Sequence, residues 1–201
     1  MAKNKTKEER KIEIMDATLE VFVKKGYAES RIDDIVQLSG LSKGAIYHHY
    51  SSKDELFLSL IDHWEMNFFP DFHGRLENGV SASDLLRGFA EEIIKEFTKR
   101  RYIFLAELEF WSLANKNEKV RERIKILYKH LLDLFKTVIL RGVESGEFRK
   151  LNPDITALSV LTSFQGVIWF TIFEHKKLSA DEYLREVIEM MIRSFTCKQE
   201  K

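Results

Sequence analysis

This chain of 201 residues contains little cysteine, proline and glycine, and its formal net charge is zero. The single cysteine, Cys197, excludes an intramolecular disulfide and a metal site built from several thiolates. Two prolines and nine glycines leave long helices uninterrupted and give strands few turn signals. The 32 basic and 32 acidic residues cancel, which argues against a protein coated in positive charge for general binding of polyanions.

No targeting segment is expected in this sequence. The first residues are charged and contain no apolar run, so the sequence predicts no signal peptide and a cytoplasmic location. One stretch without charged residues, 155–173, approaches the length of a membrane span. Hydroxyl and amide side chains dilute it, and no second candidate of this kind exists in the sequence. We therefore predict a helix buried by protein and no membrane contact, with a membrane span as the alternative.

Apolar residues recur at helical spacing along most of the chain, which predicts an all-α protein of about nine helices. Long helices are expected at 7–25, 53–69, 83–99, 155–173 and 180–195, with two short ones between 32 and 52 and two more between 102 and 142. Gly26 is expected to end the first helix, and Gly142 and Gly146 the one before 155–173. In the last helix we expect an inward face formed by Tyr183, Val187, Met190, Met191 and Phe195.

Residues 32–53 have the pattern of a helix, a tight turn, a second helix and a basic residue at the start of a third. Ser30 and Asp33 have the serine–x–x–acid spacing that caps a helix N-terminus. Gly40 provides the backbone freedom to end this helix, and Ser42 is placed to cap the next one. A short helix held against its neighbour by such a turn is the usual way to place side chains in a DNA groove.

The second of these helices has a composition suited to a DNA groove. Gly44 and Ala45 are small and allow the end of the helix to approach the wall of a duplex closely. Lys43, Tyr47 and His48 can donate hydrogen bonds to phosphates or to base edges.

The segment 40–56, GLSKGAIYHHYSSKDEL, closely resembles the TetR/AcrR family of transcriptional regulators. Tyr47, Tyr50 and Lys53 stand at hallmark positions of that family, and the likeness extends upstream through an amphipathic helix that ends at Gly26. The resemblance implies an N-terminal helix-turn-helix domain that binds double-stranded DNA. It implies phosphate contacts from Tyr47 and Lys53, and groove contacts from Ser42, Lys43, Gly44, Ala45 and His48.

Arg31 departs from the family pattern, which usually has a small hydroxyl residue at this position. We therefore expect the cap at Ser30 and infer an additional phosphate contact from Arg31. Ser52 is expected to cap the helix that begins at Lys53, where the ammonium group and the backbone N–H groups both favour a phosphate. An ordinary helical hairpin is the alternative, but exposed tyrosine and histidine in a short helix have no evident packing purpose.

The segment 105–124, LAELEFWSLANKNEKVRERI, resembles the C-terminal regulatory domain of one branch of the same family. The resemblance implies a DNA-binding domain at 1–52 and a larger ligand-binding and dimerisation domain at 53–201. In that branch the last two long helices pair with their symmetry mates, and here these are the helices expected at 155–173 and 180–195. A homodimer of this kind would bind a near-palindromic operator.

Aromatic residues, 12 % of the chain, gather in the middle helices. They either fill the core or line a cavity for a flat or oily small molecule, which is the usual design of such regulatory domains. Glu107 and Glu109 lie in an otherwise apolar helix, so each needs a basic side chain or a cationic ligand as partner. The expected ligand-binding residues are Trp64, Phe89, Phe104, Glu107, Leu108, Trp111, Tyr128, Phe135, Gln165 and Trp169.

The sequence thus predicts a ligand-responsive regulator, most simply a repressor, that binds an operator as a homodimer and is released by an effector. A constitutive DNA-binding protein with a solid core is one alternative. An enzyme with a catalytic cavity is the other, but no histidines or carboxylates have the spacing of metal ligands or of a catalytic triad. We expect no catalytic residue, no metal and no cofactor.

Overall fold

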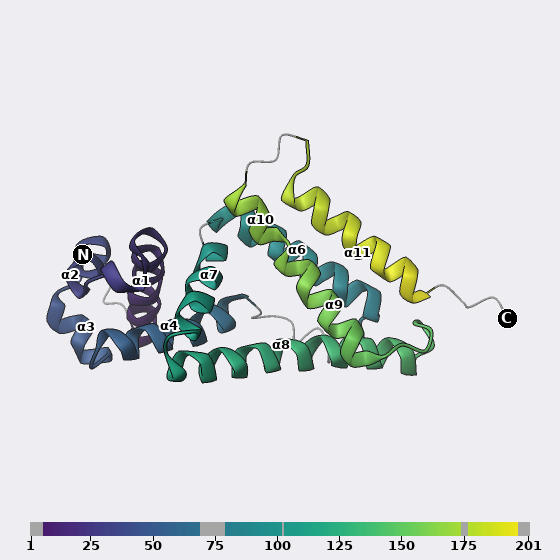
Figure 1. Ribbon diagram of the computed structural model, residues 1–201, viewed down its shortest axis with the longest axis horizontal. Helices are drawn as coiled ribbons and strands as arrows, with labels where there is room; N and C mark the ends of the chain where they lie inside the picture. Colours follow the sequence, from purple (N-terminus) through teal and green to yellow (C-terminus); the bar gives the residue numbers. More distant parts are fainter. Residues whose placement is uncertain (1–5, 69–78, 102, 174–176, 197–201) are drawn as a thin grey trace. The chain divides into compact units, whose positions relative to one another are not determined.

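The computed structural model describes residues 6–68, 79–101, 103–173 and 177–196, apart from the side chains of 64–68. Within these residues the chain forms helices and no strand, so the prediction of an all-α protein is confirmed (Figure 1). The helices are α1 (Lys7–Glu29), α2 (Ile32–Ser39), α3 (Lys43–His49), α4 (Lys53–Phe68), α6 (Ala82–Arg100), α7 (Ile103–Ala114), α8 (Glu118–Glu144), α9 (Pro153–Gln165), α10 (Val167–Ile172) and α11 (Ala180–Thr196).

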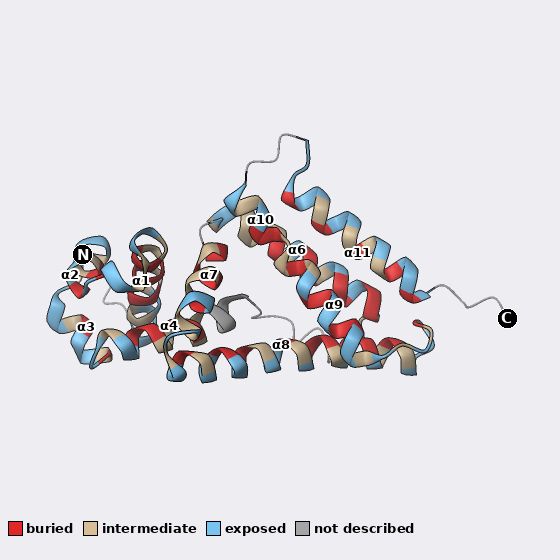
Figure 2. Cartoon of the chain, viewed as in Figure 1, coloured by how far each residue is buried: buried red, intermediate tan, exposed pale blue. Residues whose placement is uncertain are grey.

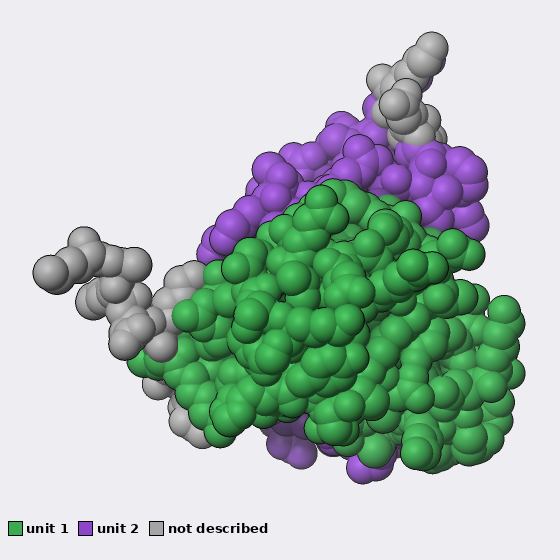
Figure 3. Space-filling model, turned by 90° about the vertical axis from the view of Figure 1, so that its left-hand side faces the viewer, with its two compact units in different colours: residues 1–67, 105–127 green, residues 68–104, 128–201 purple. Residues whose placement is uncertain are grey.

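The chain divides into two compact units, coloured separately in Figure 3. The N-terminal unit comprises residues 1–67 and 105–127, and the C-terminal unit comprises 68–104 and 128–201. Helix α8 therefore contributes its first part to one unit and the remainder to the other. The division expected from the sequence, 1–52 and 53–201, stays a prediction.

Aromatic rings from three helices form the core of the N-terminal unit. The ring of Phe57 on α4 lies 5.2 Å from that of Phe22 on α1 and 5.6 Å from that of Phe110 on α7, between centroids. Gly26, where the sequence predicts the end of α1, has a φ of 71° and interrupts the helix, which then resumes to Glu29. This break brings Tyr27 onto the same core, with its ring 4.9 Å from that of Phe57.

Ser30, the residue predicted to cap α2, does not cap it. The hydroxyl of Ser30 donates to the carbonyl of Gly26 at 2.5 Å and so closes the end of α1. The backbone N–H of Arg31 instead donates to the carboxylate of Asp34 at 2.9 Å. Because Ser30 is buried and already used by the preceding helix, its hydroxyl is not available to the next one. Gly40 ends α2 as predicted, in the left-handed region with a φ of 69°.

A second aromatic cluster forms the core of the C-terminal unit. The rings of Phe89 on α6, Phe135 on α8 and Phe164 on α9 lie 4.6 to 5.6 Å apart between centroids. Helix α11 packs on α6, α9 and α10. A two-pronged ion pair between Arg87 and Glu189, with its shorter contact at 2.5 Å, joins α6 to α11.

The inward face predicted for α11 is confirmed at Phe195, which is buried, and wrong at Met190, whereas Tyr183, Val187 and Met191 are half-buried. The hydroxyl of Tyr183 donates to the carbonyl of Ser163 at 3.0 Å, and its ring lies 5.5 Å from that of Phe170. The buried residues of this helix are Ala180, Leu184, Ile188, Ile192 and Phe195. Met190, which was expected to face inward, is 60 % exposed. Helix α11 carries two apolar stripes, and helical spacing identifies both without indicating which of them meets α6. Figure 2 shows the resulting buried and exposed sides of the helix.

Helix α8 is amphipathic, with a buried and an exposed side along its length (Figure 2). It ends at Glu144, just before Gly146, whose φ of 75° suits a helix stop. Gly142 does not end the helix as predicted. It lies buried inside α8, and a Cβ built on it would be 2.2 Å from the ring of Phe148. Glycine is therefore required at 142 for close packing.

The charge-free stretch lies in α9 and α10, which Gly166 alone separates, and the backbone angles of Gly166 (φ −53°, ψ −22°) stay in the helical region. If α9 and α10 are taken as one interrupted helix, the described residues contain nine helices, the number predicted. The segment Pro153–Ile172 is long and apolar enough to cross a membrane, with a mean hydropathy of 1.6. One such helix is weak evidence for a membrane span, because core helices share these properties. Within the single chain this segment is not buried on every face, because Ile155, Leu158 and Trp169 are exposed.

We predict that Gly142→Ala lowers the free energy of unfolding by about 1–3 kcal/mol, because the added methyl group overlaps the buried ring of Phe148. Chemical denaturation of the purified protein measures this change. Gly44→Ala is the matched control, since the nearest atom to its new Cβ would be the Ser42 hydroxyl at 3.9 Å. Equal stability of the two variants would show that Phe148 moves aside without cost.

Candidate nucleic-acid interface

Helix α3 is attached to the N-terminal unit by one side only. Its buried residue is Ile46, whose side chain is fully enclosed. Ser42 caps the helix as predicted, since its hydroxyl accepts the N–H of Ala45 at 3.1 Å. Tyr50 ends the helix, donates its N–H to the carbonyl of Ile46 at 3.0 Å and is itself buried. The start, the middle and the end of α3 are therefore all held in place.

The remaining side of α3 faces solvent in the isolated chain. Tyr47 is 46 % exposed, and Lys43, Gly44 and His48 are also exposed. Ala45 is half-buried. The structure thus places the predicted groove residues on one exposed side of a short, fixed helix.

Lys43 is paired in this structure. Its ammonium nitrogen lies 2.8 Å from a carboxylate oxygen of Asp33 in the first turn of α2. The hydrogen bond to Asp33, followed by the attraction of its charge, raises the pKa of Lys43 above its ordinary value. The charge of Lys43 at the start of α3 is therefore balanced by Asp33. From the sequence, Asp33 was expected only to help cap α2.

Lys53 is held in place by aromatic packing. Its ammonium nitrogen lies 4.3 Å from the ring centroid of Tyr27 and 3.4 Å from the carbonyl oxygen of Ala28. Partial burial lowers the pKa of Lys53. The hydroxyl of Tyr27 donates to Asp54, the residue after Lys53. Ser52 caps α4 as predicted, by accepting the N–H of Glu55 at 3.1 Å.

Sequence reasoning missed Tyr27 as a positioning residue for Lys53. The two residues lie far apart in the chain, so helical spacing does not connect them. The signal in the sequence is an aromatic residue directly after Gly26, the glycine that interrupts α1. A large ring at such a break is expected to pack on a neighbouring element.

Basic groups gather at the C-terminal end of α3. The ring centroids of His48 and His49 are 5.2 Å apart. Burial is the main cause that lowers the pKa of His49, and the charges of His48 and of Lys7 and Lys11 on α1 lower it further. The charge of Glu8 on α1 acts in the opposite direction, and Glu8 pairs with Lys11 at 3.0 Å, so the start of α1 brings charges of both signs close to His49.

Arg31 is exposed beside a polar hollow of about 400 Å³ at the junction of α1 and α2. The hollow is also lined by Lys25, Glu29 and Asp34. Lys25 and Asp34 form an ion pair at 2.7 Å, and this hydrogen bond is the main cause that lowers the pKa of Asp34.

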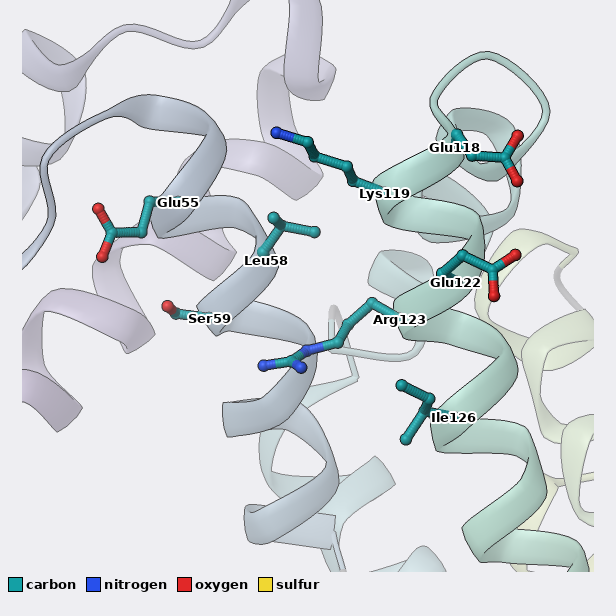
Figure 4. A pocket seen from close by; sticks show the side chains of 8 residues that line it. All are labelled: Glu55, Leu58, Ser59, Glu118, Lys119, Glu122, Arg123 and Ile126. Atoms are coloured by element: carbon teal, nitrogen blue, oxygen red, sulfur yellow. The ribbon is translucent and has the colours of Figure 1, made fainter.

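A larger groove of about 590 Å³ separates α4 from the first part of α8, inside the N-terminal unit (Figure 4). It is lined by Glu55, Leu58, Ser59, Glu118, Lys119, Glu122, Arg123 and Ile126. An ion pair from Arg123 to Asp62 joins the two helices. Helix α8 therefore has a direct contact with the helix that begins at Lys53.

The residues predicted to bind a ligand fall in both units. Glu107, Leu108 and Trp111 belong to the N-terminal unit, where Glu107 is buried and Trp111 is partly exposed. The side chain of Trp64 lies outside the described residues. The others belong to the C-terminal unit, namely Phe89, Phe104, Tyr128, Phe135, Gln165 and Trp169.

Three features of the C-terminal unit bear on these ligand predictions. Phe89 and Phe135 pack directly on each other, at 4.7 Å between ring centroids. Gln165 donates to the hydroxyl of Tyr128 at 2.6 Å, which forms a half-buried polar pair between α9 and α8. Trp169 is mainly exposed and stacks on Phe173.

Comparison with known proteins identifies the family. A model of bacterial regulatory proteins of the tetR family matches residues 14–60, and a model of the C-terminal domain of BetI-type transcriptional repressors matches residues 82–195. The chain belongs to the TetR family. It is therefore a helix-turn-helix transcriptional regulator, as its resemblance to this family predicted.

Other members of the TetR family match along nearly the whole chain. YfiR of Bacillus subtilis, an uncharacterised HTH-type transcriptional regulator, is 25 % identical over 196 residues, which cover 91 % of this chain and 94 % of YfiR. FadR of Bacillus subtilis in complex with stearoyl-CoA matches with a TM-score of 0.78 at 18 % identity, covering 90 % of this chain and 97 % of that one. A regulator from Saccharomonospora viridis in complex with choline matches with a TM-score of 0.80 at 19 % identity, covering 96 % and 100 %. These two structures show the shared fold.

Proposed function

We propose that this TetR-family regulator binds a near-palindromic operator as a homodimer and is released by a small, largely apolar or aromatic effector. The observation that carries the proposal is the arrangement of α3, which is anchored through Ile46 and leaves Tyr47 and its neighbours exposed. An exposed, rigid helix with small residues and hydrogen-bond donors suits the major groove of a duplex.

Each predicted contact has a chemical role in this proposal. Tyr47 and Lys53 donate to phosphates, and the cation–π contact with Tyr27 keeps Lys53 in position for this. Gly44 and Ala45 allow close approach of the backbone. Base edges and further phosphates are contacted by Arg31, Ser42, Lys43 and His48.

The proposed dimer uses the exposed apolar surface of the C-terminal unit. Ile155 and Leu158 on α9, Trp169 and Ile172 on α10, the adjacent Phe173, and Met190 on α11 are all exposed in the single chain. A set of large apolar side chains on neighbouring helices is typical of a surface covered by another protein chain. We infer that a second copy covers it through α9, α10 and α11, which the sequence predicted as 155–173 and 180–195.

The proposed effector site involves the C-terminal unit, where the pair of Tyr128 and Gln165 offers polar groups on the same helices as the Phe135 and Phe164 rings. The structural neighbours that contain stearoyl-CoA and choline support a ligand-binding role for this kind of domain.

The proposed coupling runs through α8, which contributes to both units. An effector that changes the position of α8 would act on α4 through the ion pair of Arg123 with Asp62 and so displace α3. A coupling free energy of about 1–3 kcal/mol between effector and DNA would suffice for control.

The relatives support a regulator and not an enzyme, and a cytoplasmic location follows from binding to DNA. The alternative of constitutive DNA binding differs only in its response to small molecules.

Tyr47→Ala is expected to reduce operator affinity by about 100-fold or more. A dimer would lose two hydrogen bonds to charged phosphates, each worth about 1.5–3 kcal/mol. Fluorescence anisotropy with an operator selected on the wild-type protein measures this loss. Lys125→Ala on α8 serves as the control, since it removes another exposed side chain of the same unit. Unchanged operator binding by Tyr47→Ala would refute the assignment of α3.

Leu158→Arg is expected to separate the dimer, because burying an unpaired charge costs about 3–5 kcal/mol. Light scattering coupled to size-exclusion chromatography reports the mass, and operator affinity should fall with it. Thr137→Arg places the same side chain on an exposed position of α8 and should leave the mass unchanged. A Leu158→Arg protein that stays dimeric would place the interface elsewhere.

A titration of the operator complex with a small-molecule library separates ligand response from constitutive binding. The library includes stearoyl-CoA and choline, the molecules bound by the two structural neighbours. We expect release of DNA by at least one apolar or aromatic member. Retention of DNA with every member would favour the constitutive alternative.

A further inference from the structure

The first turn of α2 contains two adjacent carboxylates that hold two lysines in different ways. Asp34 pairs with Lys25 and also accepts the backbone N–H of Arg31. Asp33 pairs with Lys43 alone among the residues that the structure describes. Both carboxylates are favoured by the N-terminal end of the helix dipole, but Asp34 is the one that accepts the N–H of Arg31, whereas Asp33 makes its close contact with Lys43.

The pair of Asp33 and Lys43 lies on the surface that α3 exposes. The side chain of Asp33 is 68 % exposed and that of Lys43 is 53 % exposed, so both are open to an approaching duplex. A carboxylate here repels phosphates, and it neutralises the nearest cation before DNA arrives. Such an arrangement weakens attraction to the DNA backbone, which supplies most of the affinity for random sequence.

We propose that Asp33 is a positioning residue that restrains Lys43 and thereby sets the specificity of DNA binding. The ammonium group of Lys43 is held 2.8 Å from a carboxylate oxygen of Asp33, so a phosphate of random DNA has to compete with Asp33 for this lysine. Asp33 thus lowers affinity for random DNA more than affinity for the operator. This inference rests on the proposed DNA-binding role of α3.

The central variant is Asp33→Asn, which keeps the shape of the side chain and removes its charge. An exposed ion pair contributes little to stability, so the thermal unfolding midpoint should stay close to that of the wild type. The measurement is binding to a random duplex and to the selected operator between 50 and 200 mM salt. Across this roughly fourfold range of salt concentration, the slope of log affinity against log salt gives the number of phosphate contacts.

For random DNA, the released lysine should add about one phosphate contact for each DNA-binding unit. Asp33→Asn should therefore bind random DNA more tightly than the wild type. For each DNA-binding unit, this gain in affinity should be about threefold to fourfold larger at the low-salt end of the range than at the high-salt end. The ratio of operator affinity to random-duplex affinity should fall. A purely structural role of Asp33 would change neither the salt dependence nor this ratio.

Glu122→Gln is the matched control for net charge. Glu122 also forms an exposed ion pair with a lysine, Lys125 at 2.5 Å, but it lies on α8. It should not steepen the salt dependence. A steepening equal to that of Asp33→Asn would overturn the inference, because general charge would then explain both variants.

A double-mutant cycle with Lys43→Met tests whether Asp33 acts through Lys43. In that background Asp33→Asn should no longer steepen the salt dependence, and a persistent effect would overturn the inference in favour of simple repulsion. If the wild type binds DNA but Asp33→Asn has no effect, the inference about Asp33 is overturned while the proposed function stands. A wild-type protein that binds no duplex at low salt would overturn the proposed function, and this inference with it.

Discussion

The burial of one side chain, Ile46, is the interaction on which the DNA-binding surface depends. A helix of the length of α3 is not stable by itself in water, so it needs tertiary packing and caps. Ile46 supplies the packing, Ser42 the N-terminal cap and Gly40 the turn that brings α3 back against α2. Because a single stripe of α3 is used in this way, the opposite side stays available to a partner.

Electrostatics refine this surface after packing has fixed it. Lys43 and Lys53 both lie at helix starts, yet each is restrained by a different neighbour, Asp33 in one case and Tyr27 in the other. A flexible lysine would lose conformational freedom on binding DNA, and the contact of Lys53 with Tyr27 reduces that loss, whereas the pairing of Lys43 with Asp33 opposes contact with phosphate. The same surface therefore combines cations that are already positioned with a tyrosine and a histidine that remain exposed.

The C-terminal unit shows the complementary case, in which burial is incomplete within one chain. Its interior is closed by the rings of Phe89, Phe135 and Phe164, and α11 is tied to α6 through Arg87 and Glu189. The apolar residues left outside on α9, α10 and α11 are too many for isolated surface positions. Homodimerisation is the proposal that accounts for them.

The sequence by itself determined the helical class, the position of the helix-turn-helix and its caps at Ser42 and Ser52, because these depend on short-range periodicity and local hydrogen bonds. Tertiary structure alone decided which apolar stripe of α11 turned inward, and it moved Ser30 from the start of α2 to the end of α1. It also decided the pairs of Lys53 with Tyr27 and of Lys43 with Asp33. Those choices depend on which helices meet in space, and residue spacing along one helix carries no information about its neighbour.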